Sequence, residues 1–485
     1  CKTCRLAELR SPRTLLSMPF RRILPNGARI VSARLFRAAR KLTLGGAVLL
    51  AGCATYQPRP LSPADEANKF SARTLTDPVL GQFIASHGAP EVVNHWPPAA
   101  WNFKLLTLAA WADHPEMAVA QAKLAAAEAA LTTAGGRPNP TIGFSPTYDA
   151  DALGGISPWT LGFTLDWPIE TAGKRGYRIA QAQHAANLAR LALAQTAWQV
   201  RSRVRRSLTD LEGAMRKQEI LARQLLTQNK AVTLLEARLK AGDASLTEVQ
   251  LVRIAAARTE LDGQEAKKQT NEARIRLADA LGVPPDALAG IVFDFALIDQ
   301  FPKPEEAGGL RREALLNRAD VLGALADYDA RQSALQLEFA KQYPDLHLGP
   351  GYAWDQGENK FTLGISLTLP VFNRNRGPIA EAEARRREAA AAFGATQAHV
   401  ISEVELAFAG YRDALGKLET ADALLNRQRQ RVHSIERSLT AGAIDRLEFL
   451  QAQAELGTNE LSHAAAFNEA QLALGALEDA MQRPA

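Results

Sequence analysis

Residues 174–240 form a stretch of 67 residues that contains no proline and is followed by Ala241 and Gly242. We predict one continuous helix here, because nothing in the stretch breaks it and a glycine commonly ends a helix. At 1.5 Å per residue this helix would be about 100 Å long. A chain of 52.5 kDa has no globular core of that length. The helix is therefore expected to lie beside other long helices in a coiled-coil wall.

The sequence repeats itself at a distance of about 200 residues. The offset between matching residues is first 204, then 202 and then 200, and the matches keep the same order along the chain. Such a regular offset indicates an internal duplication. The matches that composition explains least pair Pro140, Pro146, Tyr148 and Gly242 with Pro344, Pro350, Tyr352 and Gly442.

Each repeat is predicted to run helix, β-hairpin, long helix, short turn, helix. This makes the fold class mainly α with a small β part, in which long α-helices form a coiled-coil wall and each chain contributes two β-hairpins. The predicted helices are 104–134, 174–240 and 245–281 in the first repeat, and 310–341, 378–441 and 445–481 in the second. The predicted domains are a first repeat at 101–282 with its hairpin at 140–168, an inter-repeat segment at 283–309, and a second repeat at 310–482 with its hairpin at 344–370.

The predicted hairpins alternate between apolar and small or polar residues, as strands do. The alternation is unbroken in 159–167 and in 361–369. Strands of about nine residues with one apolar face have the length of strands in transmembrane barrels. We predict that the apolar face contacts lipid through Trp159, Leu161, Phe163, Leu165, Trp167, Phe361, Leu363, Ile365 and Leu367.

A half-buried sheet of a soluble protein shows the same alternation. Two hairpins joined to helices of about 100 Å, however, have no soluble core to pack against. Four strands also cannot close a barrel, and known single-chain barrels have at least eight. We therefore predict that several copies share one transmembrane β-barrel, and three copies would supply twelve strands.

This layout over residues 100–482 resembles the TolC-type outer-membrane efflux channels. The resemblance is carried by 114–117 and 317–321 in the opening helices, by the proline at each strand start, and by the Ala-Gly-x5-Glu turn of each repeat. It implies a homotrimer with a shared 12-stranded transmembrane β-barrel and a long α-helical coiled-coil barrel that extends into the periplasm. Such a trimer is a passive exit duct in the outer membrane of a Gram-negative bacterium. It also implies two partners, a periplasmic adaptor protein and an inner-membrane RND-type pump, and neither a cofactor nor an enzyme activity.

Within that family, 168–175 and 369–377 resemble the members that serve heavy-metal cation pumps. Two alternatives for the duct stay open, drug efflux and type I secretion of polypeptides, because the same fold supports both. A further alternative comes from another class of protein, a structural envelope lipoprotein that forms a coiled-coil spacer without a pore.

The first 52 residues are predicted to be a signal peptide. Basic residues precede the apolar run 42–50, which is too short to cross a bilayer of about 30 Å as a helix. The run is followed by Ala51, Gly52 and Cys53, which together with Leu50 resemble the bacterial lipoprotein box. That resemblance implies lipidation of Cys53 and a lipid-anchored linker at 53–100. A secretory signal with a chance cysteine is the alternative, and Met18 is a plausible start with 1–17 upstream of it.

The net charge of +5 comes from this front segment, because residues 1–52 hold 11 Lys and Arg but one acidic residue. The remaining residues carry a net charge of −5, so the charge gives no indication of nucleic-acid binding. The sequence contains no phosphate-binding glycine loop, no His-Glu-x-x-His and no Gly-x-Ser-x-Gly. We predict no catalytic residue and no resident metal site.

The two turns between the long helices carry the polar residues of interest. In the TolC-type family these turns form the periplasmic tip, where acidic side chains of the second repeat ring an aperture. The resemblance places Glu448 at the aperture carboxylate and Glu248 at its first-repeat counterpart. The family's arginine after the glycine is not matched, since Ala443 and Ile444 stand there. The predicted tip residues are Gly242, Asp243, Glu248, Gly442, Asp445 and Glu448, and helix capping by Asp243, Ser245 or Asp445 is the structural alternative.

Overall fold

The computed structural model describes residues 56–90, 95–152, 154–296, 298–303 and 307–484. Cys53 and the predicted signal peptide lie outside these residues. The chain divides into two units, residues 1–65 and 66–485, and the description below concerns the second unit. Within the described residues, no helix is both long enough and apolar enough to cross a membrane.

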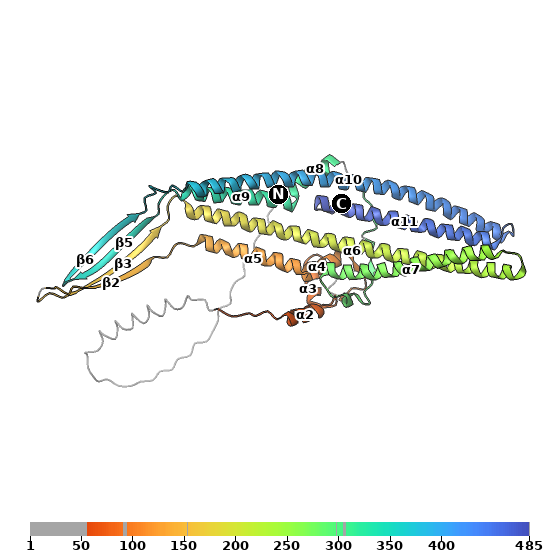
Figure 1. Ribbon diagram of the computed structural model, residues 1–485, viewed down its shortest axis with the longest axis horizontal. Coiled ribbons are helices and arrows are strands. Elements are labelled where there is room, and N and C mark those ends of the chain that lie inside the picture. The colour runs from red at the N-terminus through yellow and green to blue at the C-terminus, as the bar shows by residue number, and fades with distance from the viewer. Residues whose placement is uncertain (1–55, 91–94, 153, 297, 304–306, 485) are drawn as a thin grey trace, which may run out of the picture. The chain divides into compact units, whose positions relative to one another are not determined.

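Long helices dominate the second unit, and the two repeats contain them in the same order (Figure 1). This confirms the predicted fold class of a duplicated, mainly helical chain with two hairpins. The first repeat contains α4 (Phe103–Asp113), α5 (Pro115–Gly135), α6 (Lys174–Ala241) and α7 (Leu246–Leu281), and the second contains α8 (Ala307–Asn317), α9 (Ala319–Ala340), α10 (Arg376–Thr440) and α11 (Arg446–Met481). Shorter elements are α2 (Pro63–Ser71), α3 (Pro78–Ser86), the 3-10 helix η2 (Pro285–Leu288), β1 (Trp101–Asn102) and β4 (Phe293–Asp294).

The prediction of one helix at 104–134 is wrong, because the helix is interrupted at His114, between α4 and α5. Pro115 has no N–H to continue α4 and instead occupies the first turn of α5, where proline is favoured. The Nδ1 atom of His114 accepts a hydrogen bond from the backbone N–H of Glu116 at 3.2 Å, which caps α5. The first backbone N–H groups of α5, those of Glu116 and Met117, therefore both have hydrogen-bond acceptors in His114.

The predicted helix 310–341 is also two helices, and the break lies at Arg318. This side chain is only 4% exposed. Its guanidinium donates to Glu403 of α10 at 2.8 Å and to the carbonyl oxygen of Ala480 in α11 at 2.5 Å. Asp320 accepts two further hydrogen bonds from it. Arg318 thus fixes the angle between α8 and α9 by binding two other helices.

The four long strands form one antiparallel sheet in the order β2-β3-β5-β6. The central pair, β3 with β5, joins the two repeats and places Phe163 opposite Tyr352. Each of β2 and β6 has a strand on one side only. The bounds are Thr141–Tyr148 for β2, Trp159–Ile169 for β3, Leu346–Asp355 for β5 and Glu358–Leu367 for β6.

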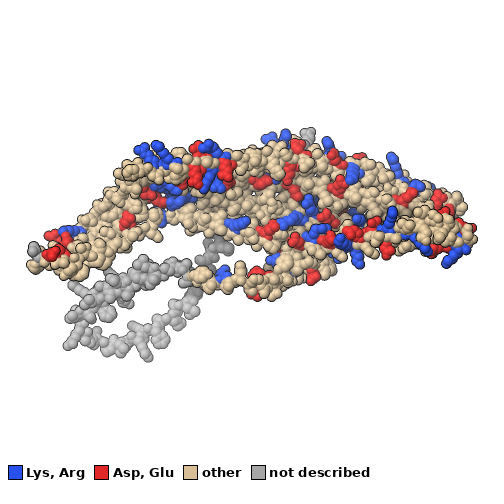
Figure 2. All heavy atoms as spheres, viewed as in Figure 1, with Lys and Arg blue, Asp and Glu red and all other residues tan. Residues whose placement is uncertain are grey.

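The helices form a wall in which α6 contacts α5 and α7 of its own repeat and α9 and α11 of the other. One apolar core, around Val200, Leu208 and Leu277, joins α4, α6 and α7. A second core, around Val400 and Tyr411, joins α10 and α11 to α8. On the face seen in Figure 2, charged side chains are scattered over the helices, whereas the strands are mainly uncharged.

Candidate functional site

Two helix-to-helix turns lie together at the end of the helices that is remote from the strands (Figure 1). The first joins α6 to α7 and the second joins α10 to α11. Both contain a glycine with a left-handed backbone, with φ of 87° at Gly242 and 72° at Gly442. A residue with a Cβ is strained in this conformation, which explains a glycine at the same place in both turns.

In the first turn, Ser245 and Glu248 cap the start of α7 reciprocally. The Ser245 hydroxyl accepts a hydrogen bond from the Glu248 N–H at 3.1 Å. The Glu248 carboxylate in turn accepts one from the Ser245 N–H at 2.7 Å. The Ser245 hydroxyl also donates to this carboxylate at 3.0 Å, and the two hydrogen bonds that the carboxylate accepts from Ser245 hold the pKa of Glu248 below its usual value. The capping alternative is therefore confirmed for Ser245, and the Glu248 carboxylate is committed to the cap.

In the second turn, Asp445 occupies the N-cap position of α11 but makes no capping hydrogen bond with its side chain. Its carboxylate instead accepts a hydrogen bond from Arg238, in the last turn of α6. This hydrogen bond is the main cause of the lowered pKa of Asp445. The contact links the first repeat to the second at the tip, and Arg238 is a residue that our reading of the sequence missed.

The side chains of two other predicted tip residues, Asp243 and Glu448, are exposed. The backbone N–H of Asp243 donates to the Arg238 carbonyl oxygen at 2.8 Å, and the Asp243 side chain is exposed. Glu448 is exposed in the first turn of α11, and no described side chain lies within hydrogen-bond or ion-pair distance of it. The structure thus brings Asp445 together with Arg238, and leaves the Glu448 carboxylate to solvent.

The predicted apolar face of the sheet is exposed in the single chain. Phe361 is 81% exposed and Phe163 is 47% exposed. Leu161 and Leu165 are half-buried. Aromatic rings pair across the strands on this face, with ring centroids 4.8 Å apart for Phe144 and Phe163. The other exposed members of the predicted set are Trp159, Trp167, Leu363, Ile365 and Leu367.

The opposite face of the sheet is crowded by small residues. A Cβ added at Gly143 would lie 2.6 Å from the Thr164 hydroxyl oxygen, and one added at Gly162 would lie 2.7 Å from the Ser145 hydroxyl oxygen. Each glycine therefore makes room for the hydroxyl on the neighbouring strand. This face combines closely spaced hydroxyls and glycines with charged side chains, among which His347 contacts Asp166 and Lys360 contacts Asp355.

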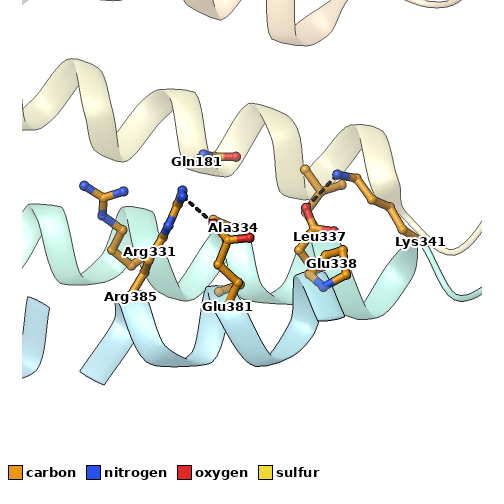
Figure 3. Close-up of a pocket in the computed structure, with 10 residues that line it drawn as sticks. Gln181, Arg331, Ala334, Leu337, Glu338, Lys341, Glu381 and Arg385 are labelled. Carbon is orange, nitrogen blue, oxygen red and sulfur yellow. Dashed lines mark hydrogen bonds and ion pairs between the residues drawn. The ribbon is translucent and has the colours of Figure 1, made fainter. Parts of the chain in front are cut away.

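A cavity of about 330 Å³ lies between α6, α9 and α10 (Figure 3). Four of its charged side chains pair with one another, Arg385 with Glu381 and Lys341 with Glu338, and Arg331 pairs with Asp327 outside the cavity. Gln181 of α6 covers it from the other side. Because its charges are already neutralised, we assign this cavity to helix packing. Among the described residues, no group of three or more His, Cys, Asp or Glu side chains is placed to hold a metal ion.

Two known proteins are similar in sequence to about half of this chain. The cobalt-zinc-cadmium resistance protein CzcC of Cupriavidus metallidurans is 27% identical over 217 residues, which is 44% of this chain and 51% of CzcC. The pyoverdine export outer membrane protein OpmQ of Pseudomonas aeruginosa is 30% identical over 262 residues, 50% of this chain and 53% of OpmQ. The chain thus spans about half the length of each of these relatives.

A solved structure shares the fold. The outer membrane protein VceC of Vibrio cholerae superposes with a TM-score of 0.63 and 21% identity, covering 78% of this chain and 95% of VceC. The family described as outer membrane efflux protein matches residues 107–283 and 310–482, one range in each repeat. Since these two ranges make up well over half of the chain, the protein belongs to the outer membrane efflux protein family.

Proposed function

We propose that the protein is a homotrimeric exit duct in the outer membrane, which receives its cargo from an inner-membrane RND-type pump through a periplasmic adaptor protein. The observation that carries the proposal is the four-stranded sheet, which exposes an apolar face and has one unpaired edge at β2 and another at β6. Three such sheets supply twelve strands, which are enough to close a barrel, and closure removes the unpaired edges. The duct acts passively, without a cofactor.

Heavy-metal cations are the cargo that we favour. The supporting observation is the similarity to CzcC, a cobalt-zinc-cadmium resistance protein. Here the metal passes through the duct as cargo and needs no resident site. The second candidate is an exported siderophore, because OpmQ is a pyoverdine export protein.

At the tip we propose that Glu448 lines the aperture. Its exposed carboxylate has no partner in the described part of the chain, whereas that of Glu248 is held in a cap. Threefold symmetry would bring three Glu448 carboxylates to one neck, where they attract cations. The tips at Gly242 and Gly442 would receive the helical hairpins of the adaptor.

At the front of the chain we propose cleavage of the signal peptide 1–52, lipidation of Cys53 and a linker at 53–100. The two matched ranges support repeats at 101–282 and 310–482 around the segment 283–309. Replacing Cys53 with Ala should abolish palmitate labelling, while the strands still insert. Labelling that persists in this variant would exclude Cys53 as the lipidated residue.

The duct is tested with the full-length protein in detergent and in planar bilayers. We expect a heat-labile trimer that conducts ions. A structural envelope lipoprotein would give no conductance. If a correctly folded trimer does not conduct ions, the exit duct is excluded. The cargo is tested in a deletion strain. Sensitivity to cobalt, zinc or cadmium supports metal efflux, whereas loss of siderophore export with normal metal tolerance supports the second candidate.

A further inference from the structure

The strands join the long helices at one end of the sheet (Figure 1), and four exposed arginines lie in the joining segments. Arg137 lies between α5 and β2, and Arg175 lies in the first turn of α6, which follows β3. Arg374 and Arg376 lie where β6 leads into α10. None of the four makes an ion pair with a carboxylate of the described chain. We call these four residues the basic belt.

The acidic residues of the same segments are already engaged. The joining segments, taken with the five helical residues beside each of them, hold seven Lys and Arg but three acidic residues, in the ranges 131–140, 170–178, 336–345 and 368–380. Each acidic side chain has its own cation, Lys174 with Asp345 at 2.7 Å, Lys341 with Glu338 at 2.6 Å, and Arg178 with Glu170. The basic belt is therefore left without a counter-charge in these segments.

Contacts of the backbone hold the basic belt in place. The Nε atom of Arg175 donates to the Gly135 carbonyl oxygen at 2.8 Å, while its two Nη atoms have no acceptor in the described chain. Asn375, the half-buried residue between the two arginines that follow β6, donates to the Glu338 carbonyl oxygen at 2.7 Å. The guanidinium groups on either side of it are exposed. Such groups can bind a phosphate through two N–H donors at once.

The charge at the hairpin end of the sheet has the opposite sign. There the segments 149–158 and 355–360 hold four acidic residues and one lysine. The helix end instead has an excess of four cations. The two ends of the strands are thus suited to different surroundings, and the helix end is suited to an anionic one.

Exposed apolar side chains border the basic belt. Phe372 is fully exposed, and Leu369 and Val371 are about two-thirds exposed. All three lie within five residues of Arg374. This combination is typical of the interface of a bilayer, where apolar groups enter the acyl chains and a long cationic side chain stays among the headgroups. A free phosphate ion would contact the arginines but leave the apolar side chains in water.

We infer that the basic belt binds the phosphate groups of anionic phospholipids in the periplasmic leaflet of the outer membrane. The inference rests on the proposed exit duct, because that function places the strands in the membrane and the helices in the periplasm. It deepens the proposed function by naming a class of lipid and the residues that bind it. Threefold symmetry would repeat the four arginines around the barrel, so that the lipids form a ring.

The inference is tested with the full-length trimer in detergent, to which either phosphatidylglycerol or the zwitterionic phosphatidylcholine is added. A ligand that binds only the folded state stabilises it, so phosphatidylglycerol should raise the temperature at which the trimer dissociates on a gel, and phosphatidylcholine should not. The fourfold variant Arg137→Gln, Arg175→Gln, Arg374→Gln, Arg376→Gln should lose this rise. In native mass spectrometry it should retain at least about twofold fewer phosphatidylglycerol molecules per trimer, because basic residues attract the anionic lipid.

A matched control removes four exposed arginines of α7 and α10 that also lack an ion pair in the described chain but lie far from the strands, with Arg258→Gln, Arg274→Gln, Arg427→Gln and Arg429→Gln. This control should keep the full rise. If the fourfold variant of the basic belt forms no trimer, its two halves are measured separately, Arg137→Gln with Arg175→Gln and Arg374→Gln with Arg376→Gln. Each half should lose about half of the rise.

The other outcomes separate this inference from the proposed function. Equal stabilisation of the wild type by both lipids, or an equal loss in the belt variant and the control, overturns the inference and leaves the exit duct intact. A belt variant that still responds to phosphatidylglycerol but shifts the reversal potential would place the arginines on the lumen, which also overturns it. Loss of the trimer from both halves in either lipid would mean that the arginines pair with another copy instead of lipid. A wild-type protein that forms no conducting trimer contradicts the proposed function itself.

Discussion

The two helix-to-helix turns derive from one duplicated segment, yet they use their carboxylates differently. In the first turn Glu248 closes a cap with Ser245. In the second turn Asp445 bonds to Arg238 of the other repeat, and the Glu448 carboxylate faces solvent. The two turns thus share the same backbone conformation, including the left-handed glycine, but their acidic side chains make different contacts. One repeat uses its carboxylate for local stability, and the other presents one to its surroundings.

The largest expected effect concerns strands, where the two repeats should behave alike. Phe163→Arg and Ile365→Arg change equivalent positions on the apolar face. Each should destabilise the inserted barrel by about 2–4 kcal/mol near the bilayer midplane, because the charge enters lipid. The yield of heat-labile trimer measures this effect.

The matched controls for these variants are Thr164→Arg and Ser366→Arg on the crowded hydroxyl face. They should assemble normally and alter conductance. Equal loss of trimer for both faces would mean that the apolar face does not contact lipid. A large difference between Phe163→Arg and Ile365→Arg would mean that the repeats are not equivalent in the barrel.

The two helix breaks, at His114 in the first repeat and at Arg318 in the second, should differ in how much they stabilise the fold. Arg318→Ala removes the hydrogen bonds to Glu403, Asp320 and the Ala480 carbonyl, and should lower the free energy of unfolding by about 2–3 kcal/mol. His114→Ala removes one cap from α5 and should cost about 1 kcal/mol. Thermal unfolding of the two variants measures the difference. Equal losses would show that the buried arginine contributes no more than a cap.

Ion selectivity should respond to the second turn alone. Glu448→Gln should shift the reversal potential in a salt gradient, because it removes a free carboxylate from the neck. Glu248→Gln should leave the potential unchanged, since glutamine can take the same place in the cap. Identical reversal potentials for wild type and Glu448→Gln would reduce Glu448 to an ordinary first-turn residue.

The smallest effect concerns the pH dependence of the tip. Arg238 lowers the pKa of Asp445 in the folded state, so the stabilisation from this pair is present above the unfolded pKa of about 3.9 and is lost as the pH falls through the lower folded value. Asp445→Asn should therefore be slightly less stable than wild type at neutral pH. The two proteins should become equally stable in strong acid. Thermal unfolding of both proteins between pH 7 and pH 2 measures this. If the difference in stability between them stays constant over that range, the charge of Asp445 does not contribute.

Much of the fold was predictable because its signals are local. The proline-free stretch and the glycine that follows it predicted α6 to within one residue at its C-terminus, which is Ala241. The alternation of Trp159, Leu161 and Phe163 predicted a strand. The break at Pro115 was equally visible, because a proline ends or kinks a helix and is favoured in the first turn of the next one. The helical periodicity that continues on both sides of Pro115 concealed it.

The contact between Arg238 and Asp445 was not predictable in the same way. The two residues are 207 positions apart. Their meeting depends on how α6 is rotated against the second repeat, which is set by the packing of α6 against α9 and α11 along its length. An arginine in the last turn of a helix is favoured by the helix dipole in any case, so its presence gave no separate signal. Arg318 is a similar case, because its partners lie in two helices that follow it in the sequence.

The 68 residues of α6 form one uninterrupted helix. Such a helix is a stiff rod of about 100 Å that amplifies small rotations at its base. A tilt of about 3° at the strand end moves the other end by about 5 Å, roughly one helical turn. That displacement exceeds the reach of a hydrogen bond. A slight change in the angle at which the helices leave the sheet is therefore sufficient to make or break side-chain contacts at the far turns, without bending any helix.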